Sequence, residues 1–224
     1  MFSFFINVYS CIICENMKRT ILYIILLTNC LVSCNKQSLF FLSNHTQNQV
    51  IALQPIDGFY LTQMDSLIYE ISTFYHKRVV LLKPINIPAN FIHQETQKYS
   101  ADSIILLLSK LKNDSLVEII GLTNKPIFTI KYLKAKYYDD EKIFGMGYQP
   151  GKACIISGNR LETNNPKIFY DRLKNVLFHE VGHNLGLSHC DNVNCIMSVE
   201  NGYFDNLDIR GKEYCKKCKQ KLKI

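Results

Sequence analysis

The stretch that decides the fold is HEVGHNLGLSHC, from His179 to Cys190, which continues through DNVNCIM to Met197. It closes a segment, Pro166 to Leu185, in which apolar residues recur at helical spacing. We therefore predict a long helix that has proline in its first turn and carries the start of this stretch. Glycine at position 186 accepts the backbone angles that end a helix and reverse the chain.

The spacing of the histidines predicts a metal site. His179 and His183 are four residues apart, so a helix places both imidazoles on one face, and the turn at Gly186 brings His189 round to them. Three neutral ligands that leave a fourth position open are the arrangement of a catalytic zinc site. Glu180, beside them on the helix, is placed to take a proton from the attacking water and deliver it to the leaving amine.

Several further residues could act as ligands or donors, but we predict supporting or structural roles for them. We expect Met197 to lie in a tight turn beneath the histidines as an apolar base. Tyr203, six residues further on, is a candidate second donor to the developing oxyanion. Cys154 lies in an apolar run and is predicted to be a buried thiol, while His76 and His93 are predicted surface or loop residues.

Four cysteines predict a second metal site. Cys190 and Cys195 flank the end of the histidine motif, and Cys215 and Cys218 form a CxxC pair near the C-terminus. Four thiolates at such spacing match a closed tetrahedral zinc site, and the lysines around the CxxC pair would offset its negative charge. Two disulfides are the alternative if the chain is exported to a compartment where thiols oxidise.

The whole pattern, HExxHxxGxxHCx4CxMx17CxxC, resembles that of the archaemetzincins, a family of zinc metallopeptidases of the metzincin clan. The resemblance implies hydrolysis of bonds in a peptide or protein substrate, in an aminopeptidase-like way, with Glu180 as the general base. An endopeptidase of the same clan and a non-catalytic, zinc-stabilised peptide-binding protein are the alternatives, and the intact Glu180 favours an enzyme. The resemblance also implies two Zn2+ per chain, a catalytic ion on His179, His183 and His189 and a structural ion on Cys190, Cys195, Cys215 and Cys218.

The chain before this motif predicts the fold class. Strand-like and helical segments alternate, which is typical of crossovers in a largely parallel sheet. We predict an α/β (α+β) metzincin-like fold: a mixed, mostly parallel twisted sheet with an antiparallel edge strand, packed helices and a small cysteine-rich C-terminal subdomain. Glycines in the edge strand indicate close approach of another backbone, either a peptide substrate or a simple hairpin partner. The expected strands are 50–55, 78–82, 117–123, 143–147 and 153–157, and the expected helices before the motif are 60–76 and 100–111.

The N-terminal residues predict export. A basic segment after Met17, the favoured true start, precedes an apolar run from Ile21 to Leu27, which is too short for a span of about 20 residues. Leu31 to Cys34 resembles a lipobox, so we expect Cys34 to be lipidated and the protein to be held at a bacterial membrane outside the cytoplasm. An uncleaved signal anchor is the alternative. The predicted organisation is a signal peptide at 1–33, a polar tether at 34–48 and a catalytic domain at 49–224.

Composition limits the other partners. The 224 residues are 47% hydrophobic, enough for one well-filled domain, and nothing in them indicates disorder. Much of the excess in the net charge of +7 lies between Arg210 and Lys223, and no stripe of interleaved basic and aromatic residues appears there. We therefore expect no nucleic-acid partner, and we expect a monomer.

Overall fold

The computed structural model describes residues 49–113, 115–133, 136–140, 143–198, 207–208 and 211–222. The predicted signal peptide and tether, with Cys34, and the candidate donor Tyr203 lie outside these residues. Within them, no helix combines the length and the apolar character needed to cross a membrane.

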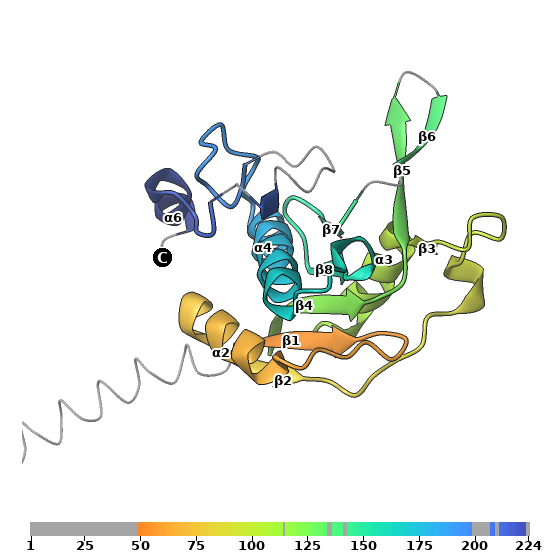
Figure 1. Ribbon diagram of the computed structural model, residues 1–224, viewed down its shortest axis with the longest axis horizontal. Coiled ribbons are helices and arrows are strands. Elements are labelled where there is room, and N and C mark those ends of the chain that lie inside the picture. Colours follow the sequence, from red (N-terminus) through yellow and green to blue (C-terminus); the bar gives the residue numbers. More distant parts are fainter. Residues whose placement is uncertain are drawn as a thin grey trace, which may run out of the picture. The chain divides into compact units, whose positions relative to one another are not determined.

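The described elements alternate between strands and helices through most of the chain (Figure 1). They are β1 (Val50–Pro55), α2 (Met64–Tyr75), β2 (Arg78–Leu81), η1 (Ala89–Phe91), β3 (Tyr99–Ser100), α3 (Ala101–Leu111), β4 (Leu116–Thr123), β5 (Ile127–Leu133), β6 (Lys136–Asp140), β7 (Gly145–Gly147), β8 (Ala153–Ser157), η2 (Asn159–Leu161), α4 (Pro166–Asn184) and α6 (Lys216–Leu222).

A five-stranded sheet in the order β2-β1-β4-β8-β7 forms the centre of the fold. The first four strands are parallel, with Leu53 opposite Ile120 and Ile120 opposite Cys154. Strand β7 runs antiparallel to β8 and forms one edge. All residues of β1 and β8 are buried, as expected for parallel strands that are covered on both faces. The predicted sheet, mixed and mostly parallel with an antiparallel edge strand, is confirmed.

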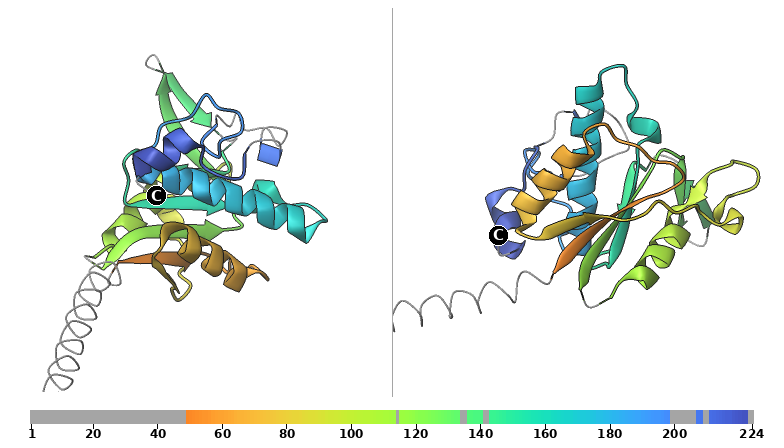
Figure 2. Two further views of the ribbon diagram at one scale, coloured as in Figure 1. Left: turned by 90° about the vertical axis from the view of Figure 1, so that its left-hand side faces the viewer. Right: turned by 90° about the horizontal axis from the view of Figure 1, so that it is seen from below.

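Helices cover the sheet on both sides. Helices α2 and α4 pack on one face and α3 on the other, as the two views in Figure 2 show. Successive side chains along each strand point to opposite faces of the sheet, so each strand contributes to the cores on both sides. Ile120 and Cys154 belong to the core under α2 and α4, whereas Ile119 and Ile155 belong to the core under α3. The predicted buried thiol of Cys154 is confirmed, since the residue is 0% exposed.

Several predicted boundaries agree closely with the structure. Strands 50–55 and 153–157 have the predicted bounds, and Ser100 caps α3 by accepting the backbone N–H of Ser103 at 3.2 Å. The prediction that a helix begins at Tyr60 was wrong, because α2 begins at Met64. Leu61 is nevertheless buried, so its apolar signal came from the core contact of the preceding turn rather than from the helix.

A second, three-stranded sheet in the order β3-β5-β6 was not predicted. Strand β5 pairs parallel with β3 and antiparallel with β6. The β5–β6 hairpin extends away from the central sheet (Figure 1). The sequence predicts no element for residues 124–142, where lysines and aspartates are mixed with tyrosines and the apolar periodicity is weak.

The residues after α4 fold back against that helix. The Cys190 N–H donates to the Met197 carbonyl at 2.7 Å, which closes the loop between them. The Ile196 N–H donates to the Glu213 carbonyl at 2.9 Å, and the Tyr214 hydroxyl donates to the Phe178 carbonyl at 2.5 Å. Backbone and side-chain hydrogen bonds therefore connect the segment before α6 to Phe178, just before the histidine motif, and to Ile196, just after it.

Candidate metal centres

Helix α4 positions the first two histidines, and both of its ends are capped. The Asn165 side chain accepts the N–H groups of Lys167 and Ile168 at 3.0 and 3.3 Å, before Pro166 in the first turn. At the other end Gly186 has φ +92°, its N–H donates to the His183 carbonyl, and the next N–H donates to the Gly182 carbonyl. This pair of bonds is the Schellman ending that glycine permits, and it turns the chain back toward the helix.

The turn brings His189 to His179 and His183. The ligand nitrogens of the three residues all lie within 4.8 Å of one another, and the Nε2 atoms of His179 and His183 are 3.1 Å apart. His179 Nδ1 lies 2.7 Å from the Ile196 carbonyl and His183 Nδ1 lies 2.8 Å from the Leu187 carbonyl. Since a carbonyl can only accept, both Nδ1 atoms carry hydrogen, and in the neutral rings both Nε2 lone pairs are available to a metal.

This donor set fits a zinc ion. Two Nε2 lone pairs at 3.1 Å repel each other unless a cation lies between them. A tetrahedral zinc bound at about 2.0–2.1 Å holds its nitrogens about 3.3 Å apart, close to the observed separation. Burial lowers the pKa of His183, and the neighbouring His189 lowers it further, which favours the neutral ring that binds metal.

Glu180 lies between the histidines and the edge strand. The residue is 7% exposed, on the side of α4 against which β7 packs. A Cβ atom at Gly145 would lie 2.9 Å from Glu180 Cγ, and one at Gly147 would lie 2.6 Å from the Glu180 carbonyl oxygen. The glycines of β7 therefore allow the edge strand to approach the helix at the candidate general base.

Met197 lies directly against the helix between the two histidines. It is 0% exposed, and a Cβ atom at Gly182 would lie 2.5 Å from its Sδ. The hydrogen bond from His179 Nδ1 to Ile196, the preceding residue, joins the same turn to the first histidine. The loop that holds Met197 therefore supports the histidines through an apolar contact and a backbone acceptor.

The four cysteines form a second group that could hold a metal ion. Their sulfur atoms lie within 4.8 Å of one another, and the Cys190–Cys215 and Cys195–Cys218 pairs are each separated by 3.8 Å. Tetrahedral zinc with bonds of about 2.3 Å holds its sulfurs about 3.8 Å apart, whereas a disulfide bond is about 2.0 Å long. A hydrogen bond from the Cys218 backbone is the largest effect that lowers the pKa of Cys215, to about 7, and so favours its thiolate.

The structure also reveals polar residues that the sequence analysis missed. Gln149 Nε2 donates to the Ser188 hydroxyl at 2.7 Å, next to the third histidine. Asn184, the last residue of α4, donates to the buried Glu118 carboxylate at 2.5 Å. Burial raises the pKa of Glu118 to about 7, although Asn184 and the charge of Lys112 lower it. The single acidic residue in the apolar run of β4 is a signal from which this contact could have been inferred.

The histidine and cysteine groups on this fold define the class: a zinc metallopeptidase, a hydrolase in which helix α4 carries HExxH and the following turn carries the third histidine. The more particular assignment follows from comparison with known proteins. A model of peptidase family M54 matches residues 36–224. The chain belongs to this family, the archaemetzincins, and the resemblance inferred from its motif is confirmed.

Relatives and solved structures agree with this assignment. Archaemetzincin from Natronomonas pharaonis is 31% identical over 134 residues, covering 56% of this chain and 71% of the relative. Archaemetzincin from Haloarcula marismortui is 29% identical over 157 residues, covering 66% and 84%. The crystal structure of archaemetzincin from Methanopyrus kandleri superposes with a TM-score of 0.64 at 22% identity, over 79% of this chain and 94% of that one. The Archaeoglobus fulgidus structure, complexed with malonate, gives 0.61 at 22% identity over 77% and 99%. These two superpositions support the fold.

Proposed function

We propose that this metallopeptidase is an aminopeptidase-like enzyme with a catalytic zinc on His179, His183 and His189. The observation that carries the zinc site is the convergence of three imidazoles, two of which donate their Nδ1 hydrogens to backbone carbonyls. The support for an aminopeptidase-like activity is the resemblance of the motif to that of the archaemetzincins. Such acceptors fix the ring orientation and the tautomer and make the other nitrogen a better ligand.

Glu180 is the proposed general base. When bound, the zinc supplies a Lewis acid that polarises a carbonyl and makes water easier to deprotonate. Glu180 directly follows the first ligand, His179, in α4. Its carboxylate is therefore near enough to take a proton from the attacking water, while the three histidines occupy the ligand positions. The same carboxyl group then gives this proton to the leaving amine. Its 7% exposure limits the access of bulk water to that proton.

A second, structural zinc is proposed on Cys190, Cys195, Cys215 and Cys218. The separation of 3.8 Å in two sulfur pairs supports this ion over two disulfides. The Cys215 N–H also donates to Cys195 Sγ at 3.3 Å, a bond that stabilises negative charge on the sulfur. Such a closed site would fasten the segment before α6 to the loop that follows the third histidine.

The edge strand β7 is the proposed binding surface for the substrate backbone. It pairs with β8 on one side only, within the described sheet, so its other side offers backbone groups to an extended peptide. The close packing of β7 on Glu180 supports this proposal, because a peptide paired with β7 would lie near the candidate base.

Peptides that differ only at the N-terminus test the aminopeptidase assignment. We would incubate the zinc-loaded protein with a peptide library and with the same library acetylated at its N-termini, and identify the products by mass spectrometry. The proposal predicts loss of N-terminal residues from the free peptides and resistance of the acetylated ones. Internal cleavage of both libraries would instead identify an endopeptidase, and an absence of cleavage in either would indicate a binding protein.

We further propose that the mature enzyme is a monomer anchored by lipid on Cys34 outside the cytoplasm. The support is the resemblance of Leu31 to Cys34 to a lipobox, after a short basic and apolar segment. Metabolic labelling with a fatty-acid analogue tests this proposal: wild type should be labelled and recovered with membranes, whereas Cys34→Ala should be unlabelled. Equal labelling of both proteins would contradict it.

A further inference from the structure

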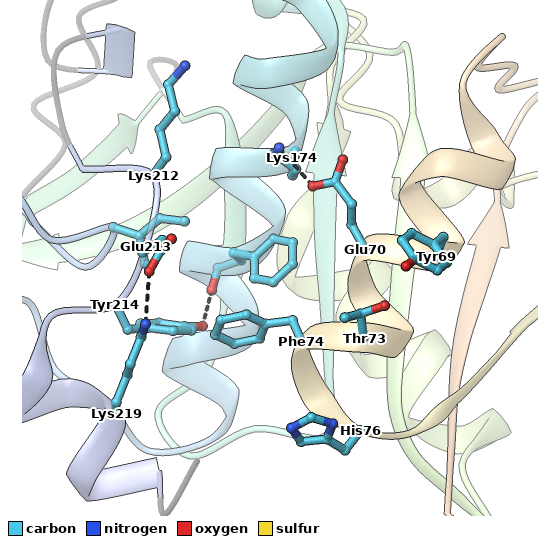
Figure 3. Close-up of a pocket in the computed structure, with 12 residues that line it drawn as sticks. Tyr69, Glu70, Thr73, Phe74, His76, Lys174, Lys212, Glu213, Tyr214 and Lys219 are labelled. Carbon is cyan, nitrogen blue, oxygen red and sulfur yellow. Dashed lines mark hydrogen bonds and ion pairs between the residues drawn. The ribbon is translucent and has the colours of Figure 1, made fainter.

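A cavity of about 560 Å³ lies between α2, α4 and the segment that leads into α6 (Figure 3). Among the described residues, its lining includes none of the three histidines of the candidate catalytic site and none of the four cysteines. Its volume is within the range of about 300–1,000 Å³ that is typical of small-molecule sites. The proposed peptidase mechanism uses none of the side chains that line this cavity.

The floor of the cavity is aromatic. Phe74 contacts Phe178 edge to face with ring centroids 5.0 Å apart, and contacts Tyr214 in a tilted arrangement at 5.4 Å. The Tyr214 hydroxyl is occupied, because it donates to the Phe178 carbonyl. Phe74 is partly exposed and offers its ring to the cavity, whereas Phe178 and Tyr214, 7% and 2% exposed, support that ring from the core, which suits a ligand with an aromatic ring.

The rim of the cavity carries spare positive charge. Both oxygens of Glu70 accept hydrogen bonds, from Lys174 and from a tyrosine hydroxyl, and Glu213 accepts from Lys219 at 2.8 Å. Lys212 differs, because its described ion pair is to Asp171 at 3.7 Å, and Lys167 already binds the same Asp171 oxygen at 2.6 Å. Figure 3 shows dashed lines between the first two lysines and their partners, but none from Lys212 to the residues drawn.

We propose that this cavity binds a carboxylate attached to an aromatic group, as at the C-terminus of a peptide that ends in phenylalanine or tyrosine. The ring packs on Phe74, and the ammonium group of Lys212 turns from Asp171 toward the cavity to pair with the carboxylate. A cationic ligand is disfavoured because the carboxylates of Glu70 and Glu213 are already paired. The flexible stem and three donors of lysine allow it to reach an anion at the rim.

The cavity is joined to the candidate catalytic site by two residues. Ile196 lines the cavity, and its carbonyl accepts the hydrogen bond from His179 Nδ1 at 2.7 Å. Phe178, on the floor, precedes His179 in α4. A ligand in the cavity therefore contacts the residues that hold the first histidine, as expected of an accessory site for peptide ends in a peptidase.

Calorimetric titration of the zinc-loaded protein with N-acetyl-L-phenylalanine tests the proposal. Saturating acetohydroxamate is added first, so that the probe's carboxylate cannot bind at the histidine site. The matched probes are N-acetyl-L-phenylalanine amide, which lacks the carboxylate, and N-acetylglycine, which lacks the ring. A further probe, 3-phenylpropanoate, keeps the ring and the carboxylate but lacks the amide, and so distinguishes a peptide end from a simple aromatic acid.

We expect saturable binding of N-acetyl-L-phenylalanine, with binding of the amide and of N-acetylglycine each weaker by about tenfold. Lys212→Met should weaken binding by a similar factor and Lys212→Arg should restore most of it. Lys110→Met should leave it unchanged, because Lys110 lies in α3, on the other face of the sheet, and does not line this cavity. Equal binding of the acid and the amide, or equal binding by wild type and Lys212→Met, would overturn the proposal. Since the readout is binding, the result does not depend on peptidase activity.

Discussion

Glu118 provides the prediction whose size follows most directly from the structure. The residue is 3% exposed on β4, and burial raises the pKa of its carboxyl group from 4.5 to about 7. A carboxyl with a raised pKa binds more protons in the folded state than in the unfolded state. Its contribution to the free energy of unfolding is therefore fully present below pH 4.5 and is lost as the pH rises through about 7.

The expected loss can be worked out from these two pKa values. At about 1.4 kcal/mol per pH unit, the interval from 4.5 to about 7 corresponds to about 3 kcal/mol, of which about 2 kcal/mol falls above pH 5.5. Glu118→Gln removes the titration but keeps an oxygen that accepts from Asn184. The variant should therefore gain about 2 kcal/mol relative to wild type between pH 5.5 and pH 8.

Urea unfolding at half-unit pH steps, with the zinc concentration held constant, measures this difference. Titrations of the histidines and other groups are shared by both proteins and cancel in the comparison. Glu162→Gln is the matched control, since Glu162 is exposed and should follow wild type across the range. Parallel stability curves for wild type and Glu118→Gln would refute the reasoning, because they would show that Glu118 does not titrate in this window.

Three other perturbations test the packing and the second metal centre. Gly147→Ala places a Cβ atom 2.6 Å from the Glu180 carbonyl oxygen, so it should lower stability by about 1–3 kcal/mol and reduce kcat/KM. Unchanged values of both would show that β7 can shift to accommodate the methyl group without cost. Tyr214→Phe removes a donor to the buried Phe178 carbonyl and should cost about 1–2 kcal/mol in urea unfolding, whereas wild-type stability would mean that this bond contributes nothing. Cys195→Ser should lower the zinc content from two ions to one per chain and reduce the melting temperature by roughly 5 °C or more. One zinc in wild type, with no free thiols among the four cysteines, would instead indicate two disulfides.

The central sheet and the histidine helix could be predicted because local patterns and packing agree there. Buried strands such as 50–55 are short apolar runs ended by turn residues, and the HExxH spacing has one simple interpretation on a helix. Gly186 marks the end of that helix because few other residues adopt its positive φ. The composition of these segments therefore contained most of the information about their structure.

The remaining features depend on contacts between distant segments. The acceptors of the histidine Nδ1 hydrogens are the backbone carbonyls of Leu187 and Ile196, which leave no signature of residue type. The β5–β6 hairpin depends on pairing with β3, which lies far from it in the sequence. The aromatic cavity joins residues of α2 and α4 with Tyr214, so neither its floor nor its charged rim could be recognised before the fold was known.

The measurement that tests the central claim most directly compares Glu180→Gln with wild type, for zinc content and for hydrolysis of the same peptides. Glutamine keeps the shape of the side chain but cannot accept the proton of the attacking water. We predict equal zinc content and a fall in kcat of about 100- to 10,000-fold, the range typical of a general base. Undiminished hydrolysis by zinc-loaded Glu180→Gln would contradict the proposed mechanism.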